Sequence, residues 1–109
     1  MNRLPMSSAA ASLLRALLGR AGVSRDRILL TEIHSTDWQS LTFIGERHVI
    51  HFTVPGFDSA SVAAELTDGL AETEFTIPGQ IVADIAFIKG EMEVDGSIDL
   101  KIEALTIAE

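Results

Sequence analysis

The three histidines are the side chains in this sequence best suited to acid–base or metal chemistry near neutral pH. His48 and His51 lie three positions apart in a stretch that alternates as a strand does, so their side chains should point to opposite faces. They cannot bind one ion together. The sequence also contains no cysteine, no glycine-rich phosphate loop and no dense group of metal ligands. We therefore predict no metal site and no cofactor.

His34 leads to a more specific prediction. If Thr36–Trp38 forms a turn, His34 lies beside Ser40, and Ser40 lies beside His51, on the outer face of a sheet. Adjacent strands are about 4.8 Å apart, so the two imidazoles would be separated by about 10 Å at their backbones. That spacing is wide for a metal ion but could suit a small ligand. The alternative is that these are exposed polar side chains on a solvated sheet face.

Other candidate residues are Asp84, Trp38 and His48. Asp84 interrupts the apolar run Ile81–Ile88, and a carboxylate in such surroundings can act as a general base; a bulge or a strand end would equally explain it. Trp38 is the only tryptophan, and it either covers an edge of the core or anchors a ligand or partner. His48 is expected on the inner face of the sheet as a hydrogen-bonded core residue.

Charge is distributed unevenly along the chain. Met1–Arg27 contains five arginines and one acid, whereas Ile28–Glu109 contains three bases and fifteen acids, for a net charge of −8. An acidic body repels phosphate backbones, so we expect no nucleic-acid partner. The predicted αβββα order in the first part of the chain resembles the topology of double-stranded-RNA-binding domains, but the predicted helix Ser59–Asp68 contains no Lys or Arg. That resemblance implies nothing about function.

The first twenty residues are rich in Arg, Ser and Ala and contain no acid, as transit peptides do. Alternatively they form a helix, either packed on the core or lying on a membrane surface, and we favour the packed helix with residues 1–6 flexible. No stretch reaches the roughly 18 apolar residues of a membrane span, so we expect a soluble, cytoplasmic protein. The apolar face of this predicted N-terminal helix repeats with the helical period and consists of Ala10, Leu13, Leu14, Leu17, Leu18 and Ala21.

After the first helix, the pattern changes to the period of two that is typical of strands. It predicts three strands, Ile28–Ser35, Gln39–Ile44 and Arg47–Val54. Gly45-Glu46 would join the last two strands as a type II′ turn. The core face of that hairpin would carry Leu41, Phe43, Ile50, Phe52 and Val54.

A second helix is predicted from Asp58 to Gly69. Asp58 can serve as its N-cap, and Phe57 is placed to pack onto Val62. Gly69 can end the helix in a left-handed conformation. A short extended segment, Glu74–Ile77, follows.

The last third of the chain should form strands. The run Ile81–Ile88 is apolar on both faces, which predicts a central strand covered on both sides or buried by a partner chain. A three-residue loop, Val94–Gly96, pairs Met92 with Ile98 and keeps the alternation intact. Beyond Ala104 the alternation changes phase, so a bulge or an interface is expected there.

Together these elements predict one α+β domain spanning residues 1–109. Two helices pack on antiparallel meander sheets in the order α-βββ-α-βββ. The halves align at an offset of about 52 residues, which suggests a weak internal duplication; chance similarity is the alternative.

Several apolar residues of the predicted strands have no partner within the chain. Because a monomer rarely exposes a large apolar patch, we predict a homo-oligomer that buries sheet surface, with a non-enzymatic assembly or binding role. The alternative is a small enzyme or ligand-binding protein whose site forms between subunits from some of His34, Ser40, His51, Asp84 and Trp38. A pocket lined by several of these would favour that alternative. The predicted self-association residues are Leu30, Ile44, Val49, Leu105 and Ile107.

Overall fold

A computed structural model describes residues 6–109 and shows the same order of elements twice, a helix followed by a β-hairpin. Residues 1–5, which include most of the N-terminal segment predicted to be flexible, lie outside the described residues. Short 3-10 helices, η1 (Arg25–Arg27) and η2 (Leu70–Glu72), follow the two α-helices. The main elements are α1 (Ser8–Arg20), β1 (Leu29–Gln39), β2 (Ile44–Val54), α2 (Ser59–Thr67), β3 (Gln80–Met92) and β4 (Ile98–Ala108).

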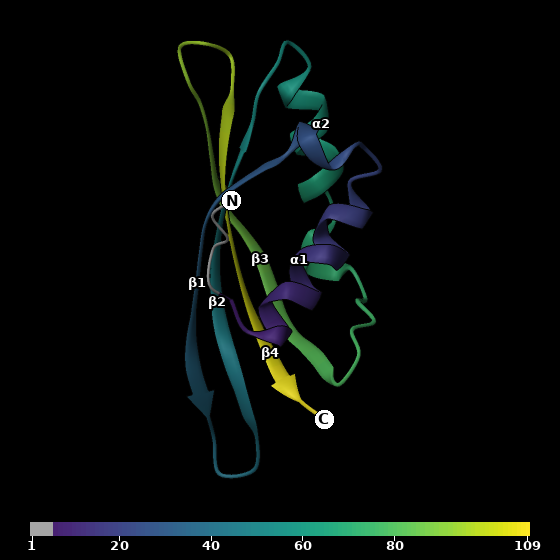
Figure 1. Ribbon diagram of the computed structural model, residues 1–109, viewed down its shortest axis with the longest axis vertical. Helices are drawn as coiled ribbons and strands as arrows, with labels where there is room; N and C mark the ends of the chain where they lie inside the picture. Colours follow the sequence, from purple (N-terminus) through teal and green to yellow (C-terminus); the bar gives the residue numbers. More distant parts are fainter. Residues whose placement is uncertain (1–5) are drawn as a thin grey trace.

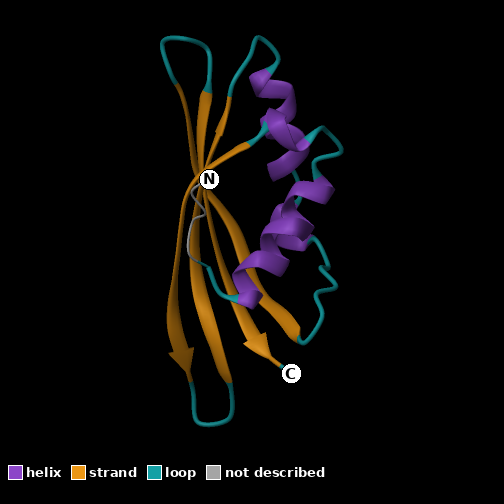
Figure 2. Ribbon diagram, viewed as in Figure 1, coloured by secondary structure: helices purple, strands orange, loops and turns teal. Residues whose placement is uncertain are grey.

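The strands form one antiparallel sheet in the order β1-β2-β4-β3, so β2 and β4 are central. Both helices lie on the same face of this sheet, and no helix or strand of residues 6–109 covers the opposite face (Figures 1 and 2). The two hairpin loops lie at opposite ends of the sheet (Figure 1). The predicted α+β class is confirmed, and each half has two long strands after its helix. The duplication itself stays a prediction.

The first half differs from the predicted meander because β1 continues through Thr36–Trp38, which we had expected to turn. The turn lies at Ser40–Phe43, where the Ser40 amide donates to the Phe43 carbonyl and the Ser40 hydroxyl accepts from the Phe43 amide. These hydrogen bonds stabilise a turn at Ser40–Phe43, so the chain can reverse direction there without a glycine. The predicted Gly45-Glu46 turn is therefore wrong, and both residues belong to β2.

This change of turn moves two apolar side chains out of the predicted core. Leu41 and Phe43 lie in the loop and are exposed, whereas Ile50, Phe52 and Val54 are buried as predicted. The inner face of β4 continues the alternation without a break through Ala104 and Thr106. No bulge is needed in β4 to place Leu105 and Ile107 on the other face.

The apolar run Ile81–Ile88 forms part of β3, which is an edge strand and not the predicted central one. Its register shifts at two points, between Val82 and Asp84 and between Phe87 and Lys89. Such bulges distort an edge and make pairing with a foreign strand less favourable. Along this edge Ile81 and Ile88 remain exposed.

The β3–β4 hairpin has the predicted geometry. Met92 pairs with Ile98, the Glu93 amide donates to the Ser97 carbonyl at 2.8 Å, and Gly96 has a φ of 90°. Only glycine adopts that backbone conformation without strain, so the three-residue loop depends on it. The predicted packing of Phe57 onto Val62 at the start of α2 is wrong, because the Phe57 side chain is exposed.

The helices close the core from one side. The stripe of α1 is buried at Ala10, Leu13, Leu14 and Leu17, as its periodicity predicted. Ser7 caps α1 by accepting the Ala10 amide at 3.1 Å. The apolar side chains of α1 and α2 pack into one core with the inner face of the sheet.

Two N-terminal arginines hold the two halves together. Arg20, at the end of α1, donates to the carbonyls of Glu65, Leu66 and Asp68 at the end of α2 and to the Thr73 hydroxyl. Arg27 pairs with Asp58, which raises the pKa of Arg27 and lowers that of Asp58. Two of the five N-terminal arginines thus bind to groups of the second half of the chain.

Candidate functional site

The uncovered face of the sheet carries most of the predicted functional residues. Strand order and register arrange its side chains in rows that cross all four strands. Residues in one row are direct cross-strand neighbours, and successive rows are about 7 Å apart along the strands. The row nearest the β1–β2 loop contains Trp38, Gly45, Ile107 and Ile81, in the spatial order β1, β2, β4, β3.

Gly45 is the feature that shapes this row. It is buried between its neighbours, and a Cβ atom there would collide with the carbonyl oxygen of Thr106. A missing side chain opposite an aromatic residue leaves a gap over which the ring can lie. Trp38, directly opposite, is half-buried.

Apolar side chains of the two central strands continue toward the middle of the face, although the next row also contains Arg47 and Asp84. Leu105 lies on the uncovered face yet is only 8% exposed, and Val49 and Ile107 are half-buried. Three of the five predicted self-association residues therefore share this surface. We call it the apolar end and define it by five residues: Trp38, Val49, Ile81, Leu105 and Ile107.

The other two predicted association residues lie elsewhere. Leu30 pairs with Phe52 and packs against the core on the helix-covered side, so its assignment to the outer face is wrong. The bulge after Leu30 shifts the alternation of β1 by one residue, which the sequence pattern alone does not reveal. Ile44 is 69% exposed at the start of β2, next to the β1–β2 loop.

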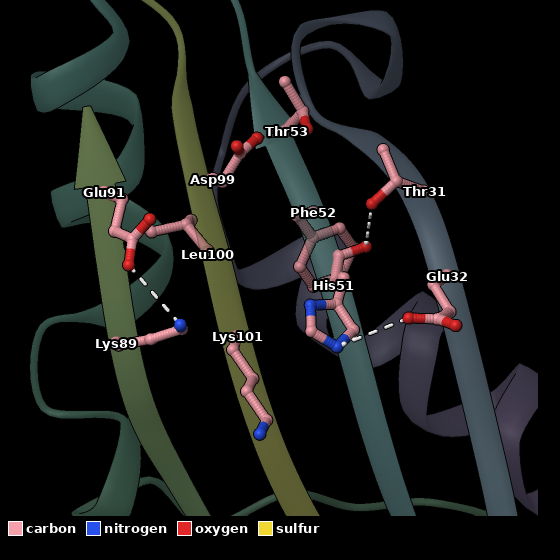
Figure 3. A pocket seen from close by; sticks show the side chains of 10 residues that line it. All are labelled: Thr31, Glu32, His51, Phe52, Thr53, Lys89, Glu91, Asp99, Leu100 and Lys101. Atoms are coloured by element: carbon pink, nitrogen blue, oxygen red, sulfur yellow. Dashed lines mark hydrogen bonds and ion pairs between the residues drawn. The ribbon is translucent and has the colours of Figure 1, made fainter. Parts of the chain in front are cut away.

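The half of the uncovered face toward the β3–β4 loop is charged (Figure 3). Here one row runs Glu32, His51, Lys101, Lys89 across the four strands. Within the chain, Glu32 contacts His51 Nε2 at 3.5 Å and Lys89 contacts Glu91 at 3.4 Å. We call this half the charged end and define it by Glu32, His51, Lys89, Glu91, Asp99 and Lys101.

A shallow depression of about 520 Å³ lies over the charged end. Thr53 donates to Asp99 at 2.7 Å along its floor, and Thr31 donates to the His51 carbonyl at 3.1 Å. Because the depression is open, its ion pairs are screened by solvent and contribute little to stability. Of the residues predicted for a ligand site, only His51 lines it.

The predicted row of His34, Ser40 and His51 does not form. His34 pairs with Val49 and is one row away from His51, while Ser40 is engaged in the β1–β2 turn. Asp84 is exposed on the uncovered face of β3, opposite Leu105 and just after a bulge. Within residues 6–109, no three His, Cys, Asp or Glu side chains are grouped so as to hold a metal ion.

His48 belongs to a buried polar chain on the helix-covered side. Its Nδ1 lies 2.7 Å from the Ser35 hydroxyl, and its Nε2 lies 2.8 Å from the Thr106 hydroxyl. Burial lowers the pKa of His48, and the nearby Glu46 opposes that shift. Glu46 in turn accepts from Ser7 at 2.6 Å, which links the chain to the start of α1.

This geometry agrees with the expectation that His48 is a hydrogen-bonded core residue. Ser35 and Thr106 were not predicted as its partners, because only the strand register brings three strands together at this point. The one signal in the sequence was the inward position of Thr106 on β4, where a polar side chain requires a partner.

Comparisons with known proteins bear on the fold. No family model matches the sequence, and no curated protein matches it significantly. The structure is similar to a solved chain described as part of the virion of a native gene transfer agent (GTA) particle, with a TM-score of 0.68 and 17% identity. The match covers 94% of this chain and 100% of that chain. At that identity it establishes a shared fold. Separately, no helix in residues 6–109 is long and apolar enough to cross a membrane.

Proposed function

We propose that this protein is a non-enzymatic assembly module whose copies associate by burying the uncovered face of the sheet. The observation that carries the proposal is the row of Trp38, Ile107 and Ile81 on a face that no helix covers. Burying apolar surface contributes about 25 cal/mol per Å², and tryptophan is among the residues that dominate interface energetics. A second copy would cover these side chains, which neither α1 nor α2 covers.

The similar fold in a virion particle supports this proposal. A structural subunit of a particle must present surfaces to other subunits, and a helix-free sheet face is such a surface. The catalytic alternative has weaker support, because His34, Ser40 and Asp84 lie apart and only His51 lines the charged depression.

The test is the mass of the protein in solution. We expect light scattering and sedimentation equilibrium to show self-association at about 0.1 mM, a concentration that reveals micromolar affinities. Substituting Ile107→Lys places a charge in the apolar end and should weaken association by about tenfold or more. Val94→Lys is the matched control, since Val94 is fully exposed in the β3–β4 loop and outside the apolar end.

The outcome tests whether copies associate through the uncovered face. Loss of association in Ile107→Lys but not in Val94→Lys would support assembly through this face. A wild-type protein that stays monomeric at about 0.1 mM would contradict the proposal, as would equal behaviour of the two variants.

A further inference from the structure

The order of side chains along each row suggests how the second copy lies. A two-fold axis parallel to the strands, along the boundary between β2 and β4, would place two uncovered faces against each other. Such a rotation keeps each row opposite the same row of the partner but reverses the strand order. Strand β1 then lies over the partner's β3, and β2 lies over the partner's β4. Strand directions stay aligned, as they do when two sheets pack face to face.

The apolar row is self-complementary under this rotation. Ile107 projects toward the partner's Gly45, the one position in the row without a side chain. Trp38 lies against the partner's Ile81, which is 51% exposed in the single chain. Each contact occurs twice, because the interface is symmetric.

The charged row is complementary as well. Glu32 on β1 lies against the partner's Lys89 on β3. Within one chain these side chains are 68% and 62% exposed and pair with His51 and Glu91 at 3.5 and 3.4 Å. Exposed pairs of that kind are weak, so both side chains can exchange partners when a second copy arrives. In the same row His51 lies against the partner's Lys101, from which an unprotonated imidazole can accept a hydrogen bond.

An axis across the strands fits less well. Centred on the middle row of the face, it would set the apolar row against the row of Leu29, Asp99 and Glu91. Ile107 would then lie against the partner's Asp99, and Ile81 against the partner's Glu91. The axis parallel to the strands also sets Val49 against the partner's Glu103 and Leu29 against the partner's Glu91. It nevertheless keeps Ile107 and Ile81 away from carboxylates and pairs Glu32 with the partner's Lys89. Because burying carboxylates against aliphatic side chains is unfavourable, the contacts of the apolar row and the charged row favour this axis.

We infer that two copies form a dimer with their uncovered sheet faces in contact, related by the two-fold axis parallel to the strands. In this dimer Glu32 of each copy pairs with the partner's Lys89. The inference rests on the proposed assembly function and adds its geometry. Glu32 and Lys89 lie on opposite edges of the sheet, with β2 and β4 between them, so they are about 14 Å apart within one chain. Any direct coupling between them must therefore pass between copies.

Charge reversal tests this pairing. Glu32→Lys alone sets two like-charged pairs in the dimer, and Lys89→Glu alone does the same with opposite sign. Each variant by itself should associate about tenfold or more weakly than the wild type. Mixing the two variants creates a heterodimer in which both pairs are complementary, so the mixture should associate more strongly than either variant alone. The double variant E32K/K89E should likewise regain association and serves if one single variant fails to fold.

Sedimentation equilibrium gives the readout, with circular dichroism to confirm folding of each variant. Glu72→Lys is the matched control, since Glu72 is exposed on η2 and away from the uncovered face. Recovery of dimers in the mixture would establish the Glu32–Lys89 contact. If the wild type associates and Ile107→Lys weakens it, but the mixture does not recover, this geometry is wrong while the assembly function stands. A monomeric wild type would overturn both.

Discussion

Trp38 of β1 lies directly opposite Gly45 of β2 on a sheet face that neither helix covers. Gly45 also pairs with Ile107 on β4, so a residue without a side chain lies between two large apolar residues in this row. The same two residues were expected in two separate turns, and the pairing arises because the strands on both sides are longer than predicted.

Gly45→Ala should destabilise the fold. The added methyl group meets the backbone carbonyl of Thr106 between paired strands, which cannot move aside as a flexible side chain can. We expect the free energy of unfolding to fall by about 2–3 kcal/mol, as for other overpacking substitutions. Urea denaturation followed by circular dichroism measures it.

Gly19→Ala is the control for that variant. Gly19 lies within α1, and a Cβ atom there meets nothing within 4 Å. Alanine should therefore stabilise the helix by about 0.5–1 kcal/mol. If both variants changed stability in the same direction, the close approach at Gly45 would not be the cause.

Arg20→Ala should weaken the link between the helices. Arg20 donates to three carbonyls at the end of α2, where the helix leaves its acceptors unpaired and where a cation is favourable. The substitution should lower the free energy of unfolding, measured by urea denaturation, by about 1–2 kcal/mol. Arg15→Ala is the matched control, because Arg15 is exposed and, among residues 6–109, donates only to Ser12 of its own helix. It should change stability by less than about 0.5 kcal/mol.

The free energy of unfolding should decrease toward acid pH because the buried His48 imidazole is less easily protonated in the folded chain than in the unfolded chain. Because burial lowers the pKa of His48, the unfolded chain takes up this proton at a higher pH than the folded chain does. The contribution is fully present above the unfolded pKa of about 6.5 and is lost as the pH falls toward the folded value. Glu46 opposes the shift but does not reverse its direction.

Urea denaturation between about pH 7.5 and pH 5 tests that dependence. His48→Gln removes the imidazole and should reduce the loss of stability over this range, whereas His34→Gln, on the exposed face, should leave most of it in place. Equal pH dependence in wild type and His48→Gln would show that the buried imidazole is not responsible.

Ser59→Ala should loosen the contact between α2 and the second hairpin. The Ser59 hydroxyl donates to the Gly96 carbonyl at 2.6 Å, and the residue is 2% exposed. The carbonyl loses its side-chain donor, so we expect a loss of about 1 kcal/mol. Ser12→Ala offers a comparison, because in the described part of the chain its hydroxyl accepts only from Arg15 in an exposed contact, so the change should be near zero.

The elements that sequence reasoning located correctly are those set by local rules. The stripe of Leu13, Leu14 and Leu17 needs only the helical period, and the Val94–Gly96 loop needs only alternation on both sides of a glycine. The position of His48 on the inner face also followed from alternation. Each of these patterns spans fewer than about twenty residues, so one stretch of sequence contains all the information.

The errors share a different origin. The predicted turn at Thr36–Trp38 contains Asp37, a residue type that is frequent in turns, yet the segment extends β1 because β2 is long enough to pair with it. The run Ile81–Ile88 has the composition of a central strand but lies at an edge, because β4 inserts between β2 and β3. Neither outcome can be read from the segment itself.

By itself, then, the sequence determined the α+β class, the two helices and the buried stripe of the first, the acidic charge of the body and the geometry of the second hairpin. Only the tertiary structure decided which strands are neighbours, and with that the rows of Trp38 with Ile107 and of Glu32 with Lys89. The physical reason is that a row joins residues up to about seventy positions apart through backbone pairing, and that pairing depends on the whole sheet rather than on any local pattern.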